Sequence, residues 1–204
     1  MIVAELQYFP PVSFVSVLFK ESYIYIDLYE TYRKMSFRNR CLIAGAEGII
    51  SLSIPLEDGR NQQLPLNEVL ISGSEKWQQR HFRSLHSAYS RSPFFEYYRD
   101  ELEVIFKQPY RRLADWNLYC LDWLSSKIKW PAEIRYTETA VPYQKTGTLD
   151  LRDLTVPKNY QQKYPLRYRQ VFEERTGFFP NLSILDLLFN AGPAVGELLM
   201  QADH

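Results

Sequence analysis

The sequence predicts a single-domain α/β protein with an N-terminal βαβ unit, a mixed sheet and a helical segment. Three observations lead to this class. The first 27 residues show strand, helix and strand patterns in turn. The spacing of the apolar residues then changes from two to 3.6 near Ser74. Finally, 204 residues are most simply one domain, because no linker, repeat or low-complexity tract divides them. We therefore expect one domain over residues 1–204.

The βαβ unit is predicted from the first 27 residues. Residues 1–7 and 23–27 are β-prone, and between them Pro11 opens a short apolar helix in the one turn where proline is tolerated. A strand, a crossover and a second strand over roughly 30 residues make a unit whose strands are parallel and whose connection is right-handed.

Further strands of the mixed sheet are expected beyond this unit. Residues 37–43 and 49–54 flank a glycine-bearing loop, which predicts a hairpin. Residues 66–72 are expected to add a strand, and residues 133–137 another.

The middle of the chain is predicted to be helical. An apolar stripe at helical spacing begins after Ser74, Pro93 opens a second helix, and residues 112–128 form a third. Residues 182–190 and a short stretch after Pro193 are expected to form the last helices.

Two stretches between these helices are less regular. Residues 138–165 are polar and rich in turn formers, which predicts a long loop or flap of the kind that is either functional or disordered. Residues 168–172 alternate as in a strand that presents Tyr168, Gln170 and Phe172 on one side.

Composition narrows the function classes. The chain has 24 basic and 24 acidic residues, so its net charge is zero and it lacks the basic excess of a nucleic-acid-binding domain. An anionic small ligand held by a few Arg or Lys side chains stays open, as does self-association into a homo-oligomer. Two cysteines and three histidines form no metal motif, and the Walker, GxGxxG, GxSxG and HExxH motifs are absent. We therefore expect neither a metal site nor a cofactor.

The N-terminal residues do not read as a targeting segment. They lack the basic region and long apolar run of a signal peptide, and no stretch approaches the roughly 18 apolar residues of a membrane span. We therefore expect a cytoplasmic protein without a membrane span.

Four segments, in this order, resemble a known family. They are residues 6–10 (LQYFP), 32–41 (YRKMSFRNRC), 77–81 with 92–95 (WQQRH and SPFF), and 168–172 with 179–193. From about residue 5 to residue 199 the chain is similar to the WbqC-like family of bacterial surface-polysaccharide gene clusters. It departs from longer members over residues 138–165, where a longer stretch is usual. The resemblance implies one WbqC-like domain and a role in O-antigen or lipopolysaccharide biosynthesis, and an aminoacyl (glycine) transferase role has been proposed for one member.

The first βα junction is the best-placed ligand site in the predicted fold. Ligands of open α/β sheets lie beyond the carboxyl ends of the strands, where helix N-termini present free N–H groups to anions. Gln7 and Tyr8 fall at this point and could orient a phosphate, carboxylate or amide group. The alternative is a strand end with ordinary capping.

The segment from Lys34 to Cys41 concentrates charge. In an extended chain Arg38 and Arg40 share one face, while Asn39 and Cys41 share the apolar face. Two guanidinium groups suit a carboxylate or a nucleotide-sugar phosphate, with Lys34 as a further cation. The alternative is a set of solvated surface charges beside a hydrogen-bonded core Asn39.

Two residues are candidates for catalysis. His81 would be the general base, and Cys41 would be the nucleophile of an acyl transfer through a thioester. Each has a structural alternative, because His81 lies on the apolar stripe of its helix and a free cysteine on an apolar face is most often packing.

The last matched segment adds two ligand-binding candidates, Tyr168 and Gln170. Asp186 is instead expected to complete a capping box with Ser183 at the start of the C-terminal helix.

These residues and the resemblance lead to one function hypothesis and one alternative. The first is a transferase of surface-polysaccharide biosynthesis that moves an aminoacyl or acyl group onto a sugar, with a nucleotide-sugar or acyl donor as its anionic partner. The alternative is a non-catalytic binding or scaffold protein of the same kind of gene cluster. The two differ in whether Gln7, Asn39 and His81 converge in one cleft.

Overall fold

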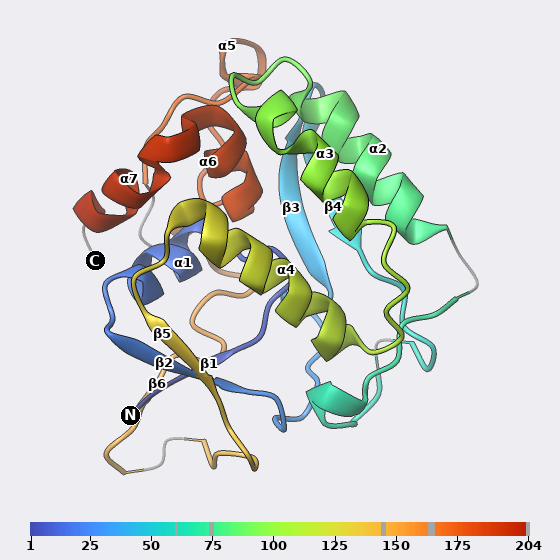
Figure 1. The fold of residues 1–204 in the computed structure, drawn as a ribbon, viewed down its shortest axis with the longest axis vertical. Helices are drawn as coiled ribbons and strands as arrows, with labels where there is room; N and C mark the ends of the chain where they lie inside the picture. Colours follow the sequence, from blue (N-terminus) through green and yellow to red (C-terminus); the bar gives the residue numbers. More distant parts are fainter. Residues whose placement is uncertain (60, 74–75, 144–145, 163–165, 203–204) are drawn as a thin grey trace.

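A parallel sheet forms one end of the molecule in the computed structural model (Figure 1). Strands β1 (Ile2–Glu5) and β2 (Tyr23–Asp27) are parallel neighbours, and helix α1 (Val12–Phe19) connects them. Strand β5 (Glu133–Tyr136) pairs with β2, and β6 (Leu149–Asp150) pairs with β1. The predicted βαβ unit is confirmed. The structure describes residues 1–59, 61–73, 76–143, 146–162 and 166–202.

Strands β3 (Arg40–Gly45) and β4 (Gly48–Ser53) form the predicted antiparallel hairpin, but as a sheet of their own. The α/β class is confirmed, whereas the expectation of one mixed sheet is wrong. Two backbone contacts explain the separation. Tyr8 N donates to Phe37 O just before β3, and Ser183 N donates to Leu42 O (2.7 Å), so the segment before α6 and not β1 pairs with the outer edge of β3.

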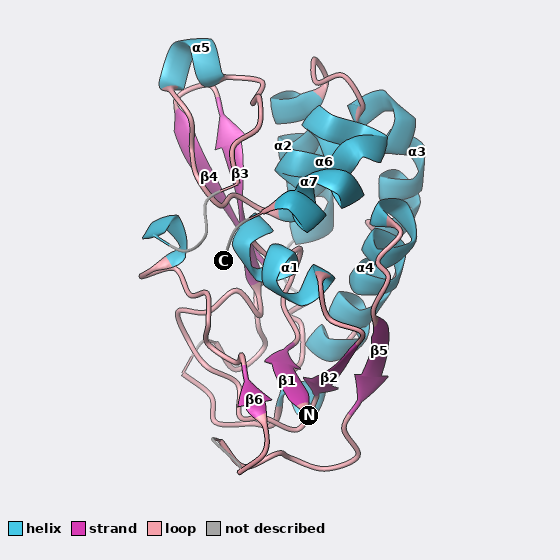
Figure 2. Ribbon diagram, turned by 90° about the vertical axis from the view of Figure 1, so that its left-hand side faces the viewer, coloured by secondary structure: helices cyan, strands magenta, loops and turns pink. Residues whose placement is uncertain are grey.

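Helices stack along one side of the hairpin, as Figure 2 shows. Helices α2 (Trp77–Tyr89), α3 (Phe95–Ile105) and α4 (Leu113–Ile128) are the three predicted in the middle of the chain. Each buries the apolar stripe seen in the sequence, and Trp116 of α4 packs edge-on against Trp77 of α2, with ring centroids 5.0 Å apart. The apolar side chains of sheet, hairpin and helices share a continuous core.

The C-terminal helices also match the prediction. Helix α6 (Ile184–Ala191) begins after Ser183, whose hydroxyl accepts a hydrogen bond from Leu185 N, and α7 (Val195–Gln201) follows a 3₁₀ turn over Gly192–Ala194. Gly192 has a φ of +53°, and a Cβ there would lie 2.4 Å from the Phe94 ring, so both conformation and packing require glycine.

Two predicted strands are absent from the described residues. Residues 66–72 contain a 3₁₀ turn (Leu66–Glu68) and isolated bridges, because Pro65 opens that turn. Residues 168–172 are irregular and lead into the short helix α5 (Glu173–Thr176), because two of their side chains turn inward to hydrogen-bond α6.

Residues 138–162 are mostly loop, as predicted, but they contribute β6, a 3₁₀ turn over Tyr160–Gln162 and several buried side chains. The predicted stretch also includes residues 144–145 and 163–165, which lie outside the described residues. Across the described part of the chain, no helix is both long and apolar enough to cross a membrane.

Candidate functional site

The carboxyl ends of β1 and β2 each place a buried acidic residue at the edge of the sheet. Glu5 ends β1 and Asp27 ends β2, and these residues face each other in the parallel register. Both side chains are buried. This edge is where open α/β sheets bind their ligands.

Glu5 is held by two donors. Gln7 Nε2 donates to Glu5 Oε1 (2.6 Å), and the backbone N–H of Asp153 donates to Glu5 Oε2 (2.8 Å). Burial raises the pKa of Glu5 to about 7, with Arg38 opposing the rise and Glu30 adding to it. The carboxyl group therefore exchanges a proton near neutral pH.

Spare hydrogen-bonding capacity surrounds this carboxyl group. Within the described part of the chain, Gln7 Oε1 and Thr155 Oγ1 are buried without a hydrogen-bond partner. Gln7 Nε2 also donates to the backbone carbonyl oxygen of Thr155 (3.5 Å), so Gln7 lies beside this residue. Buried polar atoms without partners are uncommon in folded proteins and call for an explanation.

Arg38 lies near Glu5 and forms a buried ion pair with Glu30. Its Nε and Nη2 donate to the two oxygens of Glu30 (2.9 and 2.6 Å), and its Nη1 donates to Asp153 Oδ1 (3.2 Å). Burial alone would lower the pKa of Arg38, but the carboxylates of Glu30 and Glu5 outweigh it and raise it, so the guanidinium stays charged. The Tyr143 hydroxyl also donates to Glu30 (3.0 Å).

Val141, Arg152 and Asp153 lie against this edge of the sheet, where Arg152 is the centre of a second charge cluster. Arg152 donates to Asp27 (2.7 Å) and to Asp150 (2.6 Å), and its guanidinium lies 3.8 Å from the centroid of the Tyr143 ring. Described residues of the predicted flap therefore contact Glu5 and Asp27, and the ion pairs of Arg152 hold them there.

Tyr8 and His81 form a separate buried pair. His81 Nε2 donates to the Ser53 carbonyl oxygen (3.2 Å), because a carbonyl can only accept, and Nδ1 consequently accepts from the Tyr8 hydroxyl (3.0 Å). Burial lowers the pKa of His81 to about 4, with the Ser53 bond opposing it. The imidazole is therefore neutral at pH 7.

The remaining residues of the charged block point in different directions. Asn39 is buried, accepts from the Tyr32 hydroxyl (3.1 Å) and donates to the Ile54 carbonyl (2.9 Å). Arg40 is half-buried on β3, and Lys34 is exposed near Asn61. The predicted shared face of Arg38 and Arg40 does not form, because Arg38 precedes β3 and the strand alternation does not reach it.

Cys41 is fully buried on β3, on the apolar face that the alternation predicts. Burial raises the pKa of its thiol far above the ordinary value, so the thiolate is suppressed in this conformation. A nucleophilic role for Cys41 stays a prediction.

Tyr168 and Gln170 meet at Asp186. Both donate to Asp186 Oδ2 (2.7 and 3.0 Å), and the Tyr89 hydroxyl donates to Oδ1 (2.7 Å). The carboxylate therefore binds three side chains from two other segments, and the expectation that Asp186 caps α6 is wrong. Only Ser183 acts as the cap. Burial raises the pKa of Asp186 to about 6, although the hydrogen bonds from these three donors lower it.

The structure therefore brings the sequence candidates together in pairs. Gln7 and Arg38 meet around Glu5, Tyr8 meets His81, and Tyr168 meets Gln170. The hydrogen bonds of the described residues do not join Gln7, Asn39 and His81 to one another.

The sequence did not lead us to the acidic residues at and around Glu5. Glu5 and Asp27 carried a usable signal, because each is a charged residue at the end of a strand expected in a parallel sheet, which is buried on both faces. Arg152 and Asp153 carried none, since their partners Asp27 and Arg38 lie more than 100 positions away in the chain. In the described residues no group of His, Cys, Asp and Glu side chains is arranged to hold a metal ion.

Comparison with known proteins decides the family. The model of the WbqC-like protein family matches residues 7–159, which include Gln7, Arg38, His81 and Arg152. The chain belongs to the WbqC-like protein family. This WbqC-like chain is also 27% identical over 218 residues to the uncharacterized protein Rv1507c of Mycobacterium tuberculosis, an alignment that covers 94% of this chain and 91% of the relative. No solved structure matches it significantly.

Proposed function

We propose that this WbqC-like protein is a transferase of surface-polysaccharide biosynthesis that moves an aminoacyl or acyl group onto a sugar, with Glu5 as its general acid–base. The observation that carries the proposal is the Glu5 carboxyl group, whose pKa is raised to about 7 at the carboxyl edge of the parallel sheet. A group that titrates near the working pH is the most effective proton carrier.

The neighbours of Glu5 suit a carboxyl group that gains and loses a proton. Gln7 donates to the ionised form, and its free oxygen can accept from the protonated form after the amide plane turns. Thr155 Oγ1 offers a further hydrogen bond for a substrate hydroxyl or amine, and Arg38 supplies a fixed positive charge. Because Asp153 and its neighbours lie against the buried Glu5, the substrate reaches it when these residues move.

The proposed step is an acyl transfer with Glu5 moving the proton. The acceptor amine or hydroxyl attacks the carbonyl carbon of the acyl donor, and Glu5 takes the proton that the attacking atom loses. The donor's leaving group departs with the electron pair of the broken bond and receives that proton from Glu5. In this account His81 orients the Tyr8 hydroxyl, because its neutral imidazole accepts from it.

The test has two stages, a ligand screen and then a transfer assay of a Glu5 variant. A thermal-shift screen against nucleotide-sugars, aminoacyl donors and acyl-CoA identifies what stabilises the native protein. With the donor and acceptor so found, Glu5→Gln should lower transfer by about 100-fold or more, while ligands still raise the melting temperature. Glu57→Gln, at an exposed loop residue, is the matched control and should transfer at the wild-type rate. Wild-type transfer by Glu5→Gln would remove Glu5 from the mechanism.

A non-catalytic binding protein is the second candidate function. It is favoured by the hydrogen bonds that the buried candidates already make within the protein, as structural core residues do. Tyr8 bonds to His81, Arg38 bonds to Glu30, and Asn39 bonds to the Ile54 carbonyl oxygen. On this alternative a ligand stabilises the protein, no donor and acceptor pair turns over, and Glu5→Gln leaves ligand affinity unchanged.

A further inference from the structure

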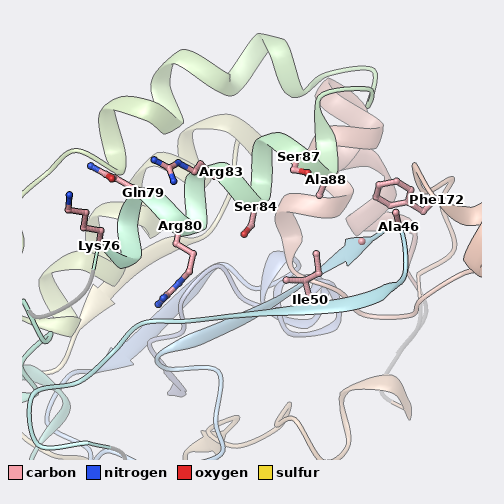
Figure 3. Close-up of a pocket in the computed structure, with 11 residues that line it drawn as sticks. Ala46, Ile50, Lys76, Gln79, Arg80, Arg83, Ser84, Ser87, Ala88 and Phe172 are labelled. Atoms are coloured by element: carbon pink, nitrogen blue, oxygen red, sulfur yellow. The ribbon is translucent and has the colours of Figure 1, made fainter.

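A groove separate from the Glu5 cluster lies between α2 and the β3–β4 hairpin (Figure 3). Its volume is about 710 Å³, within the range of small-molecule sites. Arg80 and Ser84 point from α2 toward the hairpin, and Ile50 of β4 points back toward the helix. The described lining residues include none of the candidates expected from the sequence.

Three cations line this groove from one helix. Lys76 directly precedes α2, and Arg80 and Arg83 lie on the helix itself, away from its buried apolar stripe. The described lining residues contain no Asp or Glu. Within the described part of the chain, Lys76 and Arg83 make no ion pair, although the protein as a whole has a net charge of zero. The groove therefore suits an anion, as clefts lined by one sign of charge do.

The other end of the groove is apolar. Ala88, from the edge of the buried apolar stripe of α2, lines this end, and Phe172 closes the groove beside Ala46 of the hairpin loop, at the end opposite Lys76 (Figure 3). Phe172 is half-buried, so part of its ring is accessible. An accessible aromatic ring is a stacking platform for a flat group such as a nucleobase.

We propose that this groove binds a nucleoside diphosphate, with the phosphates on Arg80 and Arg83 and the base against Phe172. The helical rise of about 1.5 Å per residue separates Arg80 from Ala88 by about 12 Å along the axis, which accommodates an extended nucleoside diphosphate. Ser84 and Ser87, between the two ends, offer hydroxyl groups for the ribose.

The inference goes beyond the proposed function, because the groove and Glu5 are separate places in the fold. The groove is instead adjacent in the chain to His81, which follows Arg80 on α2 and bonds to Ser53 at the end of β4. The positive charge of Arg80 also contributes to the lowered pKa of His81.

Direct binding tests the proposal without any turnover. Calorimetric titration of the whole protein with UDP and ADP should give saturable binding that weakens as salt is raised, because phosphate contacts are ionic. Arg83→Glu should weaken UDP binding about tenfold or more, as expected for loss of a charge-assisted hydrogen bond and its replacement by repulsion. Lys129→Glu, the same charge reversal at an exposed residue after α4, is the control and should bind like the wild type.

Ligands with and without a base test the apolar and the basic end of the groove separately. Phe172→Leu should weaken UDP about tenfold and leave the affinity for inorganic pyrophosphate unchanged, because only the base contacts the ring. Glu5→Gln should bind UDP like the wild type, so that failure of the groove and failure of the acid–base role are distinguished. The proposal is overturned if neither UDP nor ADP binds at millimolar concentration, if Arg83→Glu binds UDP normally, or if Phe172→Leu has no effect on UDP.

Discussion

Arg38→Met is expected to destabilise the protein by about 4 kcal/mol, the cost of leaving one partner of a buried ion pair alone. Arg38 and Glu30 are both fully buried and share two hydrogen bonds, so the substitution strands the Glu30 carboxylate beside Glu5 in the interior. Urea unfolding of the variant and of the wild type measures the difference in free energy.

Two further variants show whether the loss comes from the stranded charge. Arg33→Met removes a guanidinium that also pairs with Asp153 but is about half exposed, and should cost less than about 1 kcal/mol. The double variant Arg38→Met with Glu30→Gln keeps an acceptor for Tyr143 and should recover most of the loss, since a neutral replacement of a buried pair is often tolerated. A single Arg38→Met variant as stable as Arg33→Met would contradict this account.

Asp186→Ala is expected to cost about 3 kcal/mol. The carboxylate accepts from Tyr89, Tyr168 and Gln170, and its removal leaves three buried donors with a lost partner, each worth about 1 kcal/mol or more. Asp100→Ala, an 83% exposed carboxylate on α3, is the matched control and should change the free energy of unfolding by less than about 0.5 kcal/mol. Equal stability of the two variants would mean that the Asp186 contacts contribute nothing net.

The pH dependence of Asp186→Asn has a definite sign. Burial raises the pKa of Asp186 to about 6 from an ordinary value of 3.8, so the folded state binds this proton more tightly than the unfolded state. The contribution of this group to stability is therefore fully present below pH 3.8 and is lost as the pH rises through 6. The asparagine side chain of the variant cannot titrate, so the stability of the variant relative to the wild type should improve by about 3 kcal/mol between about pH 3.5 and 8. A difference that is constant with pH would contradict the raised pKa.

Local pattern was sufficient for most of the elements. The βαβ unit, the hairpin, the three central helices and α6 were predicted because apolar spacing, proline positions and a serine cap act over one or two turns. Strand β6 could not be predicted, since two residues carry no periodicity and its pairing with β1 is decided by the tertiary structure. The separation of the hairpin from the parallel sheet also depends on a long-range contact, the bond from Ser183 to Leu42.

The candidate site could be only partly predicted from the sequence, because it too depends on contacts between residues far apart in the chain. The rule that ligands lie at the carboxyl ends of parallel strands led to Gln7 and Tyr8, which are near the site, but Glu5 itself was passed over. The ion pairs that complete the cluster join residues 115 positions apart (Arg38 and Asp153) and 125 positions apart (Asp27 and Arg152). No spacing rule along the chain links such residues.

The central claim is that Glu5 exchanges a proton near neutral pH, and its side-chain carboxyl can be titrated directly. Carbon-13 NMR of carboxyl-labelled glutamate, with Glu5→Gln to assign the signal, follows the ionisation of this one group from about pH 4 to 9. The account predicts an apparent pKa of about 7 for Glu5. A carboxyl signal that titrates at or below 4.5, the ordinary value for glutamate, would contradict it.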